Sequence, residues 1–229
     1  AYTGSWAINA LLICLGAAPA LPPLATSAAF LEEVFSITST ISIPATVLPG
    51  DVLIWSQYIN SRSSGQVPVG FLEMIGVNNN NTQSCAFRVA NADDAGRVLT
   101  GFIDSGSTSA TVLLVYRPNG RVTPSFVAWN SQNATNSAPN PQNVTNPPAT
   151  GIVIVIGQMG SAAAPPGLID FATETPAFAL KSRTFINNPG GYSIVVGHTL
   201  YNGGAVTENL TFTDPGGNNI AQSGYLKLT

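Results

Sequence analysis

The sequence predicts an all-β protein, a jelly-roll-like antiparallel sandwich of two sheets with about a dozen strands and an extended N-terminal arm. Short apolar runs alternate with clusters of Gly, Pro, Asn and Ser at intervals of roughly 8 to 12 residues, which is typical of sandwiches and barrels. The 22 glycines and 17 prolines follow no fixed period, so they indicate turns rather than a collagen or solenoid repeat. Helical periodicity is confined to one short segment.

Residues 1–35 are predicted to form an apolar, proline-rich arm. Its stretch 7–25 (AINALLICLGAAPALPPLA) carries no charge, and one glycine and three prolines interrupt it. A membrane-spanning helix needs about 20 uninterrupted apolar residues. A signal peptide needs a basic first region, whereas the first cation here is Arg62. We therefore expect no membrane partner, and an arm that is covered by another protein surface. The side chains expected to make that contact are Trp6, Ile8, Leu11, Leu12, Ile13, Leu15, Leu21 and Leu24.

The end of the arm carries the one predicted helix. Residues 26–34 (TSAAFLEEV) offer Thr26 or Ser27 as a cap and place Glu32 and Glu33 near the end of the segment. We expect a short helix there, which joins the arm to the body.

The body, residues 36–229, is predicted to be the sandwich. Residues 130–150 (NSQNATNSAPNPQNVTNPPAT) are polar and rich in proline, and the apolar run GIVIVIG that follows suits a strand in the middle of a core. We therefore expect residues 130–150 to be a long surface crossover within one domain rather than a linker between two. The expected strands are 37–43, 52–58, 71–77, 84–89, 98–103, 111–116, 125–129, 152–156, 177–186, 192–200, 210–212 and 225–228.

Charged residues are scarce, and this scarcity restricts the function. They make up 8% of the chain, against about 25% in ordinary soluble domains. Eight Lys and Arg residues in all do not form the basic stripe that a nucleic-acid-binding protein needs, so we expect no nucleic-acid partner. A net charge of −3 gives little self-repulsion, which favours association into an oligomer.

Motifs for catalysis or cofactor binding are absent from the sequence. His198 is the sole histidine and shares a strand face with Val196 and Ile194, so we expect a hydrogen-bonded core residue rather than a metal ligand. The adjacent Asp93 and Asp94 lie in a turn sequence that ends in Gly, where both are expected to face water. We therefore expect no enzyme, no metal and no cofactor.

The aromatic residues and cysteines leave alternatives open. Most aromatic residues fall in apolar runs and suit a core or an interface, but Trp129 and Tyr201 adjoin polar turns and are candidates for a sugar-binding platform. Cys14 and Cys85 are expected to be free buried thiols, and a disulfide between arm and body is the alternative.

Four segments of the first half carry a resemblance to a known family. They are 43–54 (IPATVLPGDVLI), 67–71 (VPVGF), 90–102 (ANADDAGRVLTGF) and 113–117 (LLVYR). In this order they resemble a β-sandwich found in virion structural proteins of tailed bacteriophages, both capsid decoration proteins and tail fibres. The resemblance covers residues 37–120 and implies a structural role in the virion, without catalytic residues.

The resemblance and the composition together lead to a functional expectation. The chain is expected to be a capsid decoration or cement protein, a homotrimer on the capsid surface that binds the major capsid protein or other virion proteins. The alternative is a tail fibre or receptor-binding module in the virion tail that recognises a host-surface glycan. A third hypothesis, a glycosidase, requires two carboxyl groups within about 10 Å of each other in an aromatic cleft.

Overall fold

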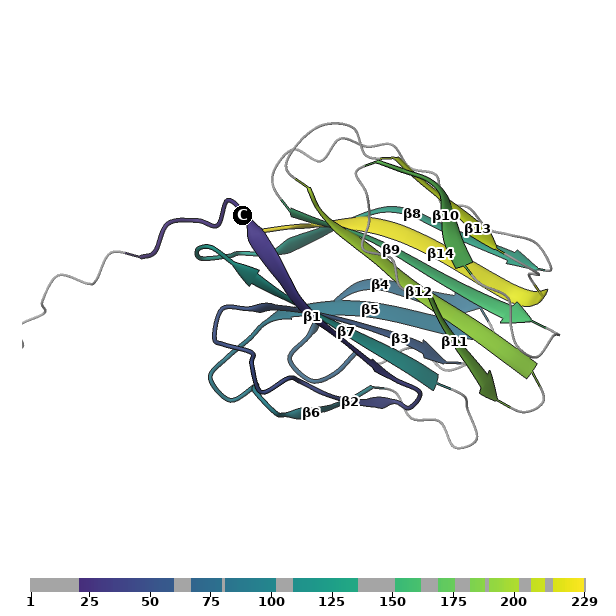
Figure 1. The fold of residues 1–229 in the computed structure, drawn as a ribbon, viewed down its shortest axis with the longest axis horizontal. Helices are drawn as coiled ribbons and strands as arrows, with labels where there is room; N and C mark the ends of the chain where they lie inside the picture. Colours follow the sequence, from purple (N-terminus) through teal and green to yellow (C-terminus); the bar gives the residue numbers. More distant parts are fainter. Residues whose placement is uncertain are drawn as a thin grey trace, which may run out of the picture.

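Strands make up the regular structure of the protein, and the part of the chain described here contains no helix (Figure 1). The computed structural model describes residues 21–59, 67–79, 81–101, 109–135, 151–161, 169–175, 182–187, 190–201, 207–212 and 216–228. Its fourteen strands pair in antiparallel fashion in several sheets. The predicted all-β class is confirmed.

The first five-stranded sheet comes from the N-terminal half of the chain. Its strand order is β1-β7-β3-β5-β4, so β1 and β4 are its edges. The central strand β3 is buried along its whole length, which explains why its sequence VLIWSQYI shows no simple polar alternation. The strands are β1 (Ala28–Ser36), β3 (Val52–Ile59), β4 (Leu72–Asn79), β5 (Asn81–Val89) and β7 (Ser109–Pro118).

The second five-stranded sheet comes from the C-terminal half. Its order is β11-β12-β9-β14-β8. Two further sheets have two strands each, β2-β6 in the first half and β10-β13 in the second. The strands of the second sheet are β8 (Ser125–Thr135), β9 (Gly151–Ser161), β11 (Ser182–Asn187), β12 (Gly190–Tyr201) and β14 (Gly216–Lys227), and the small sheets comprise β2 (Thr40–Ser42), β6 (Val98–Thr100), β10 (Ile169–Thr175) and β13 (Thr207–Phe212).

Successive residues of β3 face two different hydrophobic clusters, as strand geometry requires. Val52 and Ile54 belong to a cluster that both five-stranded sheets share. Leu53 and Trp55 belong to a second cluster, which includes residues of β2 and β6. The shared cluster comprises Val52, Ile54, Cys85, Phe87, Val112, Leu114, Tyr116, Ile152, Ile154, Val196, Leu226 and Leu228. Full burial of each aliphatic side chain stabilises the fold by about 1.5–3 kcal/mol.

The predicted helix at residues 26–34 is wrong, because these residues enter strand β1. From Ala28 onward they pair with β7, with Phe30 opposite Tyr116 and a register shift between Phe30 and Glu32. Helix propensity is a weak local preference, while a strand here satisfies the exposed backbone edge of β7. Residues 28–35, grouped with the arm above, are therefore part of the first sheet.

The second half differs from the prediction most in three strands. β8 continues to Thr135, so residues 130–135 are strand and not crossover, while residues 136–150 lie outside the described residues. Strand β10 was not predicted, and β14 begins at Gly216, well before the expected start at 225. In both strands polar residues interrupt the apolar alternation from which a strand is predicted. The strands still form because backbone pairing does not depend on hydrophobic side chains.

Candidate functional site

The loops of the first sheet gather at one end of the molecule. Strands β1, β3 and β4 run antiparallel to β5 and β7. The segments that lead into β1, β3 and β4 therefore lie at the same end as the segments that follow β5 and β7. The chain also enters β1 there, and Figure 1 shows the C-terminus beside the start of β1. This end holds two turns with buried aspartates, an open cleft and the base of the arm.

The first turn is built around Asp51, whose side chain is 2% exposed. Its Oδ2 accepts a hydrogen bond from the backbone N–H of Leu48 at 2.8 Å, and its own N–H donates to the Leu48 carbonyl at 3.1 Å, so two hydrogen bonds close the turn. Arg117 from the end of β7 donates two hydrogen bonds to the same carboxylate, through Nε and Nη2, both at 2.8 Å. The hydrogen bonds to Asp51 raise the pKa of Arg117.

The second turn repeats this design around Asp94. Its Oδ2 accepts the backbone N–H of Asn91 at 2.7 Å, and its two oxygens lie 3.2 Å from Nε of Arg88 and 3.3 Å from Nη1 of Arg97. The expectation that both members of the aspartate pair face water is therefore wrong for Asp94, which is buried, and right for Asp93, which is exposed. Two flanking arginines compensate the cost of burying this carboxylate.

Backbone hydrogen bonds connect the two turns into one unit. Gly50 N–H donates to the carbonyl of Ala90 at 2.9 Å, and Ala90 N–H donates to the carbonyl of Asp51 at 2.7 Å. Ile43 and the segment at Gly96 and Arg97 exchange two more bonds, of 2.8 and 3.0 Å. Both buried carboxylates thus hold loops and arginines in place.

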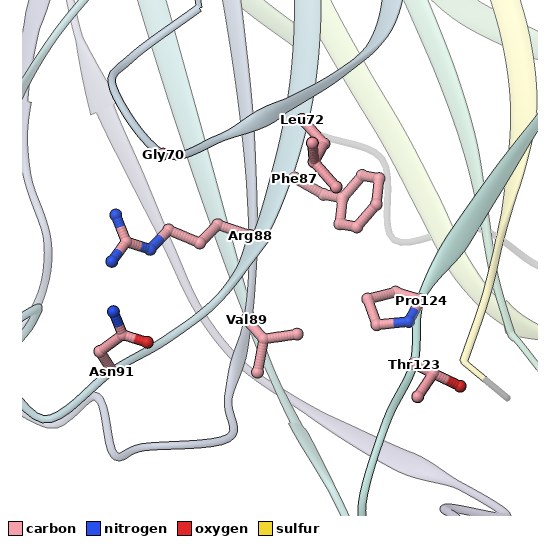
Figure 2. Close-up of a pocket in the computed structure, with 8 residues that line it drawn as sticks. All are labelled: Gly70, Leu72, Phe87, Arg88, Val89, Asn91, Thr123 and Pro124. Carbon is pink, nitrogen blue, oxygen red and sulfur yellow. The ribbon is translucent and has the colours of Figure 1, made fainter.

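An open cleft of about 450 Å³ lies beside the second turn. Figure 2 shows Arg88 and Asn91 on one side and Thr123 and Pro124 on the other, with the ring of Phe87 directed toward Pro124. The cleft thus separates the β4-β5 edge of the first sheet from the residues that lead into β8. Its lining is Gly70, Leu72, Phe87, Arg88, Val89, Asn91, Thr123 and Pro124.

Arg88 is the one charged residue among those that line the cleft, and it is already engaged. Its Nε lies against Asp94, and its Nη1 donates to the carbonyl of Val69 at 3.4 Å. Gly70 lets the loop pass over this guanidinium: its φ is +86°, and a Cβ there would lie 2.5 Å from Nη1. The cleft therefore presents mainly apolar surface and no unpaired cation.

The base of the arm is fixed to the turn between β7 and β8. Leu24 forms a parallel bridge with Arg121, with hydrogen bonds of 2.9 Å from Ala25 N–H to the Arg121 carbonyl and from Arg121 N–H to the Pro23 carbonyl. Gly120 permits this contact, because a Cβ on it would lie 2.6 Å from the Pro23 carbonyl oxygen. The side-chain oxygen of Asn119 accepts the backbone N–H groups of Thr26 and Ser27, at 2.9 and 3.1 Å.

The sole histidine connects the two five-stranded sheets. His198 in β12 is 1% exposed, and its Nδ1 shares a hydrogen bond with the hydroxyl of Tyr116 in β7. The ring of Phe30 in β1 lies 4.5 Å from the imidazole, measured between centroids. The prediction of a hydrogen-bonded core histidine is confirmed.

The structure places only some of the residues singled out in the sequence. Leu21 and Leu24 are exposed, at 73% and 46%. Trp129 lies in β8 and Tyr201 ends β12, but their side chains lie outside the described part. Cys85 is a free, buried thiol, and Cys14 lies outside the described residues. The arm residues Trp6, Ile8, Leu11, Leu12, Ile13 and Leu15 lie outside the described residues.

The sequence interpretation missed the burial of Asp51 and Asp94, their arginine partners and the cleft. One signal was present: in a chain with only eight Lys and Arg residues, Arg88 and Arg97 flank Asp94 closely. An aspartate in a turn with two such neighbours is a candidate for a buried ion pair. The cleft had no such signal, because Thr123 and Pro124 reach it from a distant part of the sequence.

Two further observations concern the described ranges alone. Within them, no group of three or more His, Cys, Asp and Glu side chains is placed to hold a metal ion. Those same ranges hold no helix of the length and apolar character needed to cross a membrane.

Comparison with known proteins identifies no family for the chain. No protein-family model, curated protein or solved structure matches it. The proposals that follow therefore depend on the residues and geometry of this chain.

Proposed function

We propose that this chain is a non-enzymatic structural protein of a tailed-phage virion, a decoration or cement protein that binds and stabilises the capsid. Its fold would be a two-layer sandwich of the five-stranded sheets, which the hydrophobic cluster common to both sheets supports. Its partners would be the major capsid protein or other virion proteins, and its oligomer a trimer on the capsid surface.

The observation that carries this proposal is the exposed apolar segment before β1. Leu21 and Leu24 are exposed although both are large and apolar, and Figure 1 shows the chain leading away from the sheets before β1. The turn at Gly120 holds the base of this segment, so its direction is set by the body. A fixed, outward-directed apolar segment is suited to burial against another protein surface.

The aspartate turns support a structural role over a catalytic one. Asp51 and Asp94 are the buried carboxylates of the described residues, and arginines neutralise both. Cross-linked loops of this kind stiffen the end of the molecule from which the arm emerges. A rigid base reduces the entropy that attachment to a lattice would cost.

The proposal is tested by locating the chain on assembled particles. Gold-labelled antibodies against the folded protein are applied to particles of the phage whose genome encodes this chain. The position of the label is then mapped by electron microscopy. Label distributed over the head supports the decoration role. Label at the tail tip would instead favour the receptor-binding alternative, and unlabelled particles would reject both.

A binding measurement tests the role of the exposed leucine. Leu21→Asp should weaken association with stripped particles by tenfold or more, because burying one leucine contributes about 1.5–3 kcal/mol and about 1.4 kcal/mol equals a factor of ten. Val98→Asp is the matched control, since Val98 in β6 is 57% exposed but lies outside the arm. Equal binding by both variants would reject the arm as the attachment element.

A further inference from the structure

The cleft beside Arg88 has the properties of a binding site for an uncharged apolar segment. Leu72, at the start of the edge strand β4, is 64% exposed, although its neighbours Phe87 and Pro124 provide an apolar wall. The volume of about 450 Å³ falls in the range of pockets that bury small ligands, about 300–1,000 Å³. An edge strand also offers backbone groups for pairing with an added chain.

The electrostatics of the cleft argue against a charged ligand. Asp94 neutralises Arg88, whose guanidinium also donates to a backbone carbonyl, so an incoming anion would meet a cation whose charge is already compensated. No carboxylate is among the eight lining residues, so a cation finds no counter-charge there. The site therefore favours a ligand without charged side chains.

One segment of this chain has that chemistry. Residues 1–20 (AYTGSWAINALLICLGAAPA) contain no charged side chain, and their densest apolar run is 11–15, LLICL. The described segment that follows, Leu21 to Pro23, leads away from the body (Figure 1). Pro22 and Pro23 have a fixed φ, which opposes a tight return of the arm onto its own cleft.

We propose that the cleft receives residues 1–20, the leading part of the arm, from a second copy of this chain. The inference rests on the proposed function: Leu21 and Leu24 remain the part of the arm proposed to contact the capsid, and residues 1–20 are assigned to the neighbouring copy. The apolar side chains of the run 11–15 pack on Leu72, Phe87 and Pro124, and the uncharged backbone passes beside Arg88 and Asn91.

The arm is long enough for this exchange. Twenty extended residues reach up to about 66–72 Å, whereas a domain of this length has a radius of gyration of about 17 Å. Because the arm and the cleft are different surfaces, the contact is head-to-tail. In a closed ring of copies, the arm of each copy occupies the cleft of the next copy. A trimeric ring of this kind agrees with the proposed oligomer.

The native Cys14 lies within the run 11–15 and provides a direct test. A full-length chain carrying Leu72→Cys and Cys14→Ser is co-expressed with the wild-type chain, and the assembled protein is oxidised without denaturant. Cys85 is buried and its burial raises the pKa of the thiol, so it does not compete. We expect a disulfide between position 72 of one chain and Cys14 of the other, identified by non-reducing electrophoresis and peptide mass spectrometry.

The control pair replaces Leu72→Cys by Val98→Cys in the same Cys14→Ser background, since both side chains are similarly exposed. A between-chain yield at least fivefold above this control supports the proposal, and a yield equal to the control overturns it. A within-chain disulfide in the single variant Leu72→Cys would also overturn it, because the arm would then fill its own cleft. The test needs no particles, so its failure is separable from a failure of head labelling.

Discussion

Replacing Asp94 by Asn removes the charge of a buried carboxylate while keeping its shape. Asp94 is 1% exposed and faces Arg88 and Arg97, whose side chains are 14% and 37% exposed. The amide keeps one oxygen for the backbone N–H of Asn91, so the turn itself can persist. The substitution therefore leaves chiefly one defect, a mostly buried guanidinium without a counter-charge.

The expected loss follows from the exposure of the two arginines. Removing one partner of a buried ion pair destabilises a protein by about 3–5 kcal/mol. Arg88 is mostly but not fully buried, which favours the lower end, and the exposed Arg97 adds less than about 1 kcal/mol. We expect Asp94→Asn to lower the free energy of unfolding by about 3 kcal/mol. For a chain of this size, that loss corresponds to a decrease in Tm of about 6–12 °C.

Urea denaturation followed by tryptophan fluorescence measures this difference directly. Asp93→Asn is the matched control: it is the adjacent residue, makes the same chemical change and is exposed, so its effect should stay within about 0.5 kcal/mol. If Asp94→Asn is as stable as Asp93→Asn, the carboxylate does not hold Arg88, and our account of the turn and of the cleft wall fails.

Two further predictions concern the arm base and the buried thiol. Gly120→Ala should accelerate proteolytic cleavage before residue 28, because its Cβ would lie 2.6 Å from the Pro23 carbonyl and 3.1 Å from Ala25 N. If mass spectrometry finds unchanged cleavage sites and rates, the contact at Gly120 does not hold the base of the arm. Burial raises the pKa of the Cys85 thiol above its ordinary 9.0. Above about pH 9 the unfolded chain therefore loses this proton while the folded chain keeps it. The free energy of unfolding should then fall as the pH rises. Cys85→Ala should flatten this decline by up to about 1.4 kcal/mol per pH unit. Parallel pH profiles for this variant and the wild type would show that the buried Cys85 thiol does not cause the decline.

The strand pattern of the first half was predictable because each strand there has its own apolar signal. Residues 52–58 and 111–116 were expected as strands and are the centre of the first sheet, β3 and β7. Burial on both faces produces continuous apolar runs, which are visible in the sequence without any tertiary information.

The error at residues 26–34 has a tertiary cause. Ala, Leu and Glu favour a helix in isolation, but β7 would otherwise present an unpaired edge beside them. Satisfying that row of backbone groups outweighs a local preference of a few tenths of a kcal/mol per residue. A single sequence does not reveal which edge will be free.

The two aspartates of the adjacent pair illustrate the same limit at the level of one side chain. Local sequence correctly indicates a turn at Asp93 and Asp94, with short polar residues and a following Gly. It does not distinguish the exposed member from the buried one, because that depends on where β5 ends and places Arg88.

The sequence by itself determined the all-β class, the positions of most first-half strands, the core histidine and the apolar character of the arm. These properties depend on composition and on the two-residue period of strands, which are local. The tertiary structure alone decided that β1 completes a sheet, that Asp94 is buried between arginines, and that Thr123 and Pro124 face Phe87 across a cleft. Each of these depends on contacts between residues far apart in the chain, where packing and backbone pairing select among locally equivalent conformations.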